Sequence, residues 1–169
     1  MKQELLFNPD GPALSILPAT PSAVYDRMIA WNSAYPEWDI RRVGSERSQT
    51  VDKPRFMNEV SAALQFPYYF GHNWSAFREC INDLSWLRGA SFLIIFDSAQ
   101  HLLSESDEDF QVLLGILTDT HNEWRSVTAD FGDRGELPIA FQSVLACDPD
   151  AIDALTERIS ATDASYVHL

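Results

Sequence analysis

The spacing of hydrophobic and polar positions changes several times along this chain, and each change predicts a secondary-structure element. Hydrophobic residues recur every three or four positions in residues 21–35 and 55–65 and again after Ser106, which predicts amphipathic helices. Two continuous hydrophobic runs, SFLIIF at residues 91–96 and PIAFQSVL at residues 138–145, have the length of strands. Strands without polar alternation are typical of parallel sheets that are covered on both faces.

Helices that alternate with a few hydrophobic strands indicate an α/β fold. A further strand is expected at residues 40–43, so the sequence predicts a small three-stranded parallel sheet packed with helices. Four prolines interrupt the first 21 residues, which favours short extended pieces there. We therefore predict that residues 1–40 form an N-terminal layer appended to the main domain. Residues 41–169 are expected to form that domain, with Asp148 and Pro149 at the start of its C-terminal helix.

The segment at residues 66–87, FPYYFGHNWSAFRECINDLSWL, places an aromatic turn directly before a helix with two different faces. Asn73 is expected to cap the start of this helix. On a helical wheel one face is hydrophobic and belongs to the core: Trp74, Phe77, Cys80, Ile81, Leu84 and Leu87. The opposite face is an acidic strip that includes an indole: Ser75, Glu79, Asn82, Asp83 and Trp86. Two interpretations stay open, a surface that binds a partner and a face that is simply solvated.

The charge of the chain restricts the partners that such a strip would accept. The net charge is −13 with a pI near 4.5, which opposes binding to nucleic acid or to an anionic membrane and favours a basic protein. Residues 79–123 carry nine acidic residues against Arg88 alone, so the negative charge is concentrated around the strip. Glu4, Pro9 and Asp10 interrupt any secretion signal, and we expect a cytoplasmic protein.

No motif for catalysis or metal binding stands out. The nucleophile-elbow, P-loop and dinucleotide-binding motifs do not occur, and the histidines lack metal-ligand spacing. Cys80 and Cys147 are expected to be buried free thiols. We therefore predict a protein that is not an enzyme and has no cofactor and no metal. A hydrolase that uses Glu79 and Asp119 as a carboxylate pair would need a deep pocket joining them.

Residues 66–80, FPYYFGHNWSAFREC, resemble the signature of the barstar family, whose members are intracellular protein inhibitors of secreted ribonucleases. The order of elements over residues 43–145 is also similar to that family's small parallel-sheet fold. In the family, the loop and the helix after it cover the active site of the ribonuclease, and acidic side chains replace the phosphates of the substrate. The resemblance therefore implies an immunity protein that inhibits a basic ribonuclease-type toxin.

The family positions can be placed on this sequence one at a time. The loop aromatic falls on Tyr69 and the asparagine falls on Asn73. The two acidic helix positions fall on Ser75 and Glu79, so the first acid is missing and the second is kept. An acid of the last family helix aligns with Asp119.

The aromatic positions of the family also differ here. Arg78 replaces the tryptophan expected before the second acid, and Leu84 replaces a later aromatic residue, so Trp86 is expected to supply the indole instead. The loss of the acid at Ser75 favours the alternative that the fold serves a partner that is not a nuclease. The predicted partner-binding residues are Tyr69, Phe70, His72, Asn73, Trp74, Ser75, Arg78, Glu79, Asn82, Asp83, Trp86 and Asp119.

Overall fold

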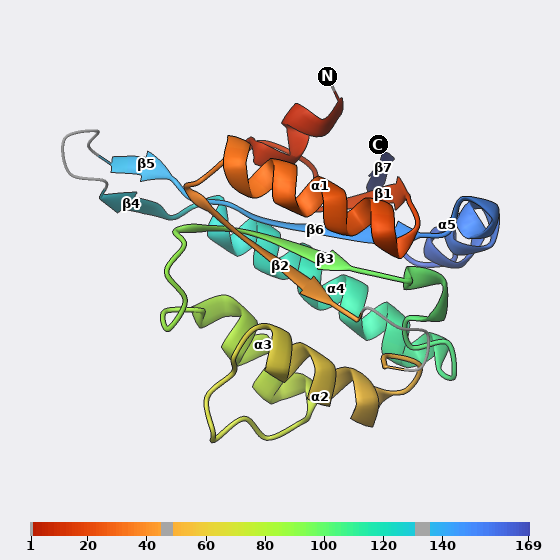
Figure 1. Cartoon of the computed structure of the whole chain (residues 1–169). Coiled ribbons are helices and arrows are strands. Elements are labelled where there is room, and N and C mark those ends of the chain that lie inside the picture. The colour runs from red at the N-terminus through yellow and green to blue at the C-terminus, as the bar shows by residue number, and fades with distance from the viewer. Residues whose placement is uncertain (1, 45–48, 131–135) are drawn as a thin grey trace.

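A five-stranded parallel sheet forms the centre of the protein (Figure 1). The computed structural model describes residues 2–44, 49–130 and 136–169. Across the sheet the strands lie in the order β2 (Trp38–Val43), β3 (Ser91–Phe96), β6 (Phe141–Cys147), β1 (Leu14–Pro18) and β7 (Tyr166–His168). A separate antiparallel pair joins β4 (Thr128–Asp130) to β5 (Glu136–Pro138).

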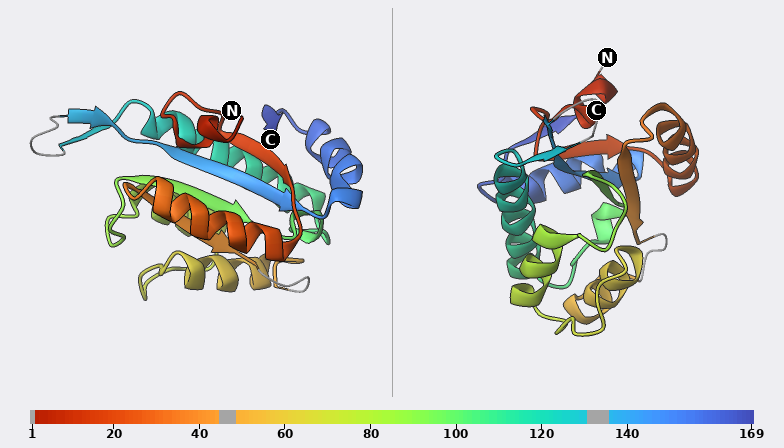
Figure 2. Two further views of the ribbon diagram at one scale, coloured as in Figure 1. Left: turned by 45° about the horizontal axis from the view of Figure 1, so that its top comes forward. Right: turned by 90° about the vertical axis from the view of Figure 1, so that its left-hand side faces the viewer.

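Helices cover both faces of this sheet, and the end-on view in Figure 2 separates the two layers. One face carries α1 (Pro21–Ala34) together with the short 3-10 helix η1 (Lys2–Phe7). The other face carries α2 (Lys53–Ala63), α3 (Trp74–Asp83), α4 (Asp107–Trp124) and α5 (Ile152–Ser160). Two further 3-10 helices, η2 (Ala99–His101) and η4 (Pro149–Ala151), follow β3 and β6.

The β3 strand explains how the two layers are held together. All six of its residues are buried, as the unbroken hydrophobic run predicts. Successive side chains of a strand point to opposite faces, so Phe92, Ile94 and Phe96 enter the cluster that includes the residues of α2 to α5. Leu93 and Ile95 enter the cluster beneath α1. Both faces of the sheet are therefore sealed by helices.

The α/β class and the parallel sheet are confirmed, but the prediction of three strands is wrong. β1 pairs with β6 on one side and with β7 on the other. Residues of the first forty positions thus lie inside the sheet and do not only form a layer appended to it. β1 has only five residues, of which the last is Pro18, and β7 has only three, so neither strand has a strong sequence signal. The division of the chain at residue 40 stays a prediction.

Two local predictions also need correction. Residues 138–145 do not form one strand, because Pro138 ends β5 and the chain then enters β6 in a different sheet. Proline has no backbone N–H and cannot donate within a central strand. The second correction is partial: Asp148 and Pro149 do stand at the start of the C-terminal helical segment, because Asp148 is the N-cap residue of η4, which runs directly into α5. The Asp148 carboxylate makes no capping bond, however, and instead accepts a hydrogen bond of 2.8 Å from Gln100 Nε2.

Candidate partner-binding surface

The aromatic loop between α2 and α3 is divided into an anchored part and an exposed part. Phe70 is only 6% exposed, and its ring packs edge-on against Phe66 with 4.9 Å between the ring centroids. Tyr68 and Tyr69 point outwards, with exposed fractions of 101% and 65%. Phe70 therefore fixes the loop to the core, whereas the two tyrosines are available to a partner.

Three consecutive residues fix the junction between this loop and α3. Asn73 Oδ1 accepts a hydrogen bond of 2.9 Å from the Ala76 backbone N–H, so the predicted cap is present. Asn73 Nδ2 donates to the Gly71 carbonyl at 3.1 Å, which ties the side chain to the loop as well. His72 is exposed, has a positive φ of 51° and keeps its Nδ1 at 3.0 Å from the Phe70 carbonyl. The cap thus positions both the loop and the first turn of the helix.

Trp74 turns towards the interior of the protein and not towards the acidic strip. Its ring packs against Phe56 and Phe77, and its Nε1 donates a hydrogen bond of 2.8 Å to Asp109 Oδ1 at the start of α4. This half-buried side chain therefore connects α3 to α4. Its contribution to the surface is to hold α3 in place.

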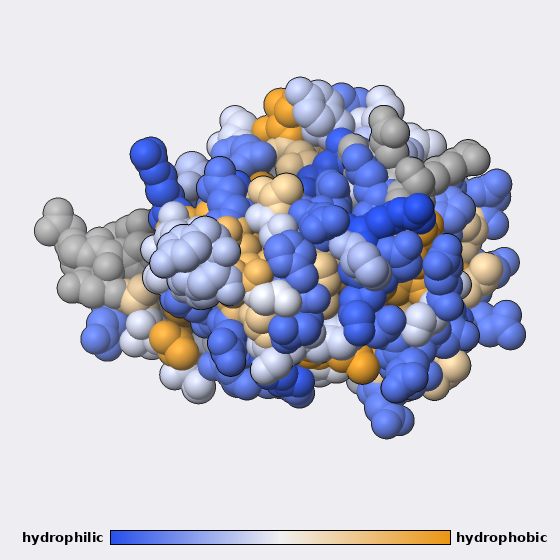
Figure 3. All heavy atoms as spheres, turned by 90° about the horizontal axis from the view of Figure 1, so that it is seen from below, coloured by the Kyte–Doolittle hydropathy of each residue, from blue (hydrophilic) through white to orange (hydrophobic). Residues whose placement is uncertain are grey.

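The outer face of α3 forms the predicted strip. Ser75, Glu79 and Asp83 are exposed along it, and Asn82 is half-buried. Arg78, which is not a member of the predicted strip, is exposed beside it. Figure 3 views the molecule from the side of α2 and α3 and shows a mainly hydrophilic face with small hydrophobic patches between polar side chains. The strip is therefore polar and accessible, as the helical wheel predicts.

A groove of about 170 Å³ lies between the loop and this strip. Glu79 and Asp83 bring two carboxylates to it from successive turns of α3. Burial raises the pKa of the Cys80 thiol at this groove, and the negative charges of the two carboxylates raise it further. The groove is lined by Tyr69, Phe70, Ala76, Glu79, Cys80, Asp83 and Trp86.

Trp86 lines the groove, but it does not lie on the helix as the helical wheel predicts. The helix ends at Asp83, because Leu84 adopts a left-handed conformation with φ 46°, so Trp86 lies in the turn beyond it. Its Nε1 donates a hydrogen bond of 2.9 Å to the Leu64 carbonyl, and its ring stands at 88° to Phe66. The helical placement of Trp86 was wrong, yet the indole and the acids do line one groove.

Arg78 and Asp119 form an ion pair between α3 and α4. The distance from Arg78 Nη1 to Asp119 Oδ2 is 2.9 Å, and the two side chains are 45% and 54% exposed. The acid that the resemblance aligns with the last family helix is therefore already paired within the chain. Its partner is the arginine that replaces the expected tryptophan.

The two carboxylates of the hydrolase alternative lie in different grooves. Glu79 lines the groove beside the aromatic loop, whereas Asp119 lines a groove between α4 and residues 161–164. Among the described residues, no three histidine, cysteine or acidic side chains are placed so that they could hold a metal ion. In the same part of the chain, no helix has the length and hydrophobicity needed to cross a membrane.

The fold is a small α/β scaffold in which a parallel sheet carries an aromatic loop and a helix with an acidic outer face on one side. A family model described as Barstar (barnase inhibitor) matches residues 44–145. This match covers more than half of the chain, and the protein belongs to the barstar family, as the sequence resemblance predicted. A search of curated proteins gives no match. The family match includes α2, α3, α4, β3 and most of β6, and it leaves β1, β2, α1, α5 and β7 outside.

The structure also adds residues that sequence reasoning did not assign to the site. Tyr68 is fully exposed beside Tyr69, and the two rings contact each other edge-on. Ala76 and Cys80 line the groove, although the wheel placed Cys80 on the core face. Cys80 lies at the border of the two helix faces, so it is only 5% exposed and still lines the surface groove.

Proposed function

We propose that this protein binds a basic ribonuclease-type toxin and inhibits it by covering its active site. The observation that carries the proposal is the groove in which Glu79 and Asp83 lie beside the rings of Tyr69 and Trp86. Family membership supports the same function, because the family's description names an inhibitor of barnase. As the sequence-based prediction has it, the site of action is the cytoplasm.

The charges of the groove favour a cationic partner. Glu79 and Asp83 are four positions apart on one helix face, an arrangement in which like charges destabilise the free helix. Arginine, lysine or histidine side chains of a partner would relieve this repulsion and form charge-assisted hydrogen bonds with the carboxylates. The net charge of −13 would also speed the encounter with a basic protein at low salt.

The aromatic side chains supply the second component of such an interface. Tyrosine and tryptophan are enriched among residues that dominate binding energy, because they bury a large area with few rotatable bonds. Tyr69 is exposed, whereas Trp86 is held by its hydrogen bond to Leu64. We expect the partner to be bound between the exposed ring of Tyr69 and the fixed ring of Trp86, with its cation near the carboxylates.

The proposal is tested by inhibition assays with a panel of basic secreted ribonucleases at low and physiological salt. We expect tight inhibition of at least one enzyme. Glu79→Gln should weaken that complex at least tenfold and reduce its salt dependence, because a charged contact in the groove is lost. Glu157→Gln removes the same charge from an exposed position on α5 and should have little effect. Undiminished activity of every enzyme, with no complex formed, would count against ribonuclease inhibition.

A second candidate is a barstar-family module that binds a protein other than a nuclease. Ser75 in place of an acid, and the pairing of Asp119 with Arg78, favour it, because both reduce the negative charge offered to a nuclease active site. Capture of partners from the native cytoplasm distinguishes the two. Recovery of a nuclease whose binding depends on Glu79 supports inhibition, and recovery of another protein with the same dependence supports the second candidate.

A further inference from the structure

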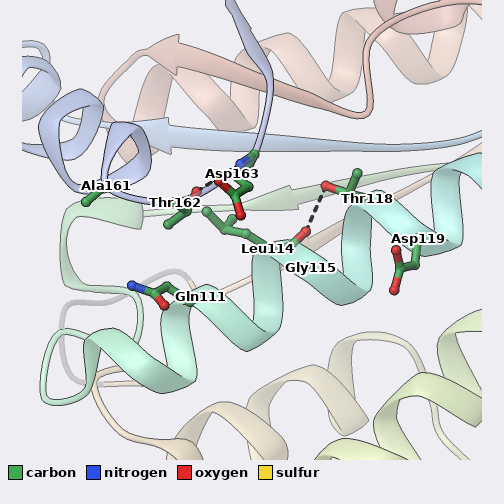
Figure 4. Close-up of a pocket in the computed structure, with 9 residues that line it drawn as sticks. Gln111, Leu114, Gly115, Thr118, Asp119, Ala161, Thr162 and Asp163 are labelled. Atoms are coloured by element: carbon green, nitrogen blue, oxygen red, sulfur yellow. Dashed lines mark hydrogen bonds between the residues drawn. The ribbon is translucent and has the colours of Figure 1, made fainter.

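A second groove lies between α4 and the segment that joins α5 to β7. Its volume is about 350 Å³. Figure 4 shows Thr162 and Asp163 of this segment next to the α4 turn that contains Leu114 and Gly115. Residues 161–164 lie outside the family match, so this groove is built partly from a segment that the family pattern does not include.

The floor of the groove is Gly115, and no contact described for this position requires a glycine. Gly115 lies in the middle of α4 and is exposed, and a Cβ atom added to it would meet no atom within 4 Å. Glycine in a helix interior lowers helix stability relative to alanine. What Gly115 provides is an open floor, where a side chain from another molecule can approach the helix backbone.

Three of the polar side chains around this floor can only accept further hydrogen bonds, whereas the Gln111 amide can both donate and accept. Thr118 Oγ1 already donates to the Leu114 carbonyl at 2.8 Å, and Thr162 Oγ1 donates to the Ile159 carbonyl at 2.7 Å. Both hydroxyls therefore have no proton left to donate, although Thr162 Oγ1 already accepts one hydrogen bond of 3.1 Å from the Ala164 N–H. The Asp163 carboxylate can only accept. A guanidinium group has five donors and no acceptor, and its planar shape matches a carboxylate in a bidentate manner.

This groove adjoins the surface that we propose for ribonuclease binding. Asp119 lines one end of it and is bonded to Arg78 on the outer face of α3. We infer that the groove receives an arginine side chain of the same basic partner, so that the interface extends from α3 across α4. The inference rests on the proposed function and adds a second contact site to it.

The test is calorimetric titration of the ribonuclease that the unmodified protein inhibits. Gly115→Leu fills the floor with a strong helix former and should weaken binding about tenfold while leaving the melting temperature unchanged or raising it by about 2–4 °C. Asp163→Asn should weaken binding to a similar extent. Asp153→Asn removes the same charge from an exposed position on α5 outside the groove and should change binding less than twofold.

The outcomes separate the groove from the function on which it rests. If Glu79→Gln weakens the complex but Gly115→Leu and Asp163→Asn bind as tightly as the unmodified protein, the arginine site is overturned and the proposed function stands. If no ribonuclease binds the unmodified protein, both are overturned. Weakening by both groove variants, with the control Asp153→Asn unaffected, supports the arginine site.

Discussion

Removing Arg78 should strengthen binding to a basic partner while changing stability only slightly. Arg78 is the one cationic side chain of α3, and it pairs with Asp119 of α4 at 2.9 Å. The change Arg78→Ala leaves Glu79 and Asp83 of α3 and Asp119 of α4 without this positive charge beside them. A basic ribonuclease would then meet a more negative surface.

The structure sets the size of both effects. The Arg78 and Asp119 side chains are 45% and 54% exposed, and ion pairs of this kind contribute at most about 1 kcal/mol to folding. For a chain of this length, such a loss lowers the melting temperature by about 2–4 °C. Freeing one carboxylate next to a cationic partner should tighten binding at low salt about tenfold, which corresponds to ~1.4 kcal/mol.

The measurement is stopped-flow association with the inhibited ribonuclease at several salt concentrations, together with thermal denaturation. Arg125→Ala is a matched control, because Arg125 is 47% exposed, is paired with Asp10 at 3.3 Å and lies at the end of α4. It changes the net charge equally and should alter association much less. If Arg78→Ala weakens binding instead, Arg78 contacts an acidic group of the partner and our interpretation of the strip is wrong.

Two further predictions concern the scaffold. Asn73→Ala removes the cap of α3 and should lower the free energy of unfolding, measured by urea denaturation, by about 1 kcal/mol. Asn73→Asp keeps the capping oxygen and should therefore lose much less stability than Asn73→Ala. Equal stability of the two variants would contradict the capping role. Burial lowers the pKa of His121 below its ordinary value of 6.5, although its hydrogen bond to the Phe141 carbonyl partly offsets this. As the pH falls, His121 is therefore protonated in the unfolded chain before it is protonated in the folded one. Its effect on the free energy of unfolding is absent above pH 6.5, and the folded protein loses stability as the pH drops below that value. Urea denaturation at pH 7.5 and 5.5 should show a smaller loss for His121→Asn than for the unmodified protein, and an equal loss would refute this.

The sequence predicted those elements whose signal is local. β3 is hydrophobic at five of its six positions and β6 at five of its seven, and every residue of both strands is buried, as expected for a sheet that is covered on both faces. β1 could not be recognised in the same way, because the strand consists of only five residues and its place between β6 and β7 depends on pairing with residues 143–147 and 166–168. A local sequence pattern contains no information about pairing between segments so far apart in the chain.

The candidate site shows the same limit. The loop, the cap and the acidic strip were predictable because they lie within one continuous segment. The pairing of Arg78 with Asp119 joins residues 41 positions apart, and it was not predicted. The turn at Leu84 was missed as well, because a left-handed non-glycine residue leaves no clear signal in the sequence.

The distribution of charge on α3 does not stabilise the free helix. Helices are stabilised by acids in the first turn and by bases in the last turn. α3 has neither, and Asp83 instead places a negative charge at its C-terminal end, close to Glu79. A cation held between these carboxylates would offset both the helix dipole and the repulsion between the acids. Because the acid expected at Ser75 is missing from the first turn, the negative charge of α3 lies nearer to Trp86. We therefore expect the essential cations of the partner to contact the C-terminal half of this helix.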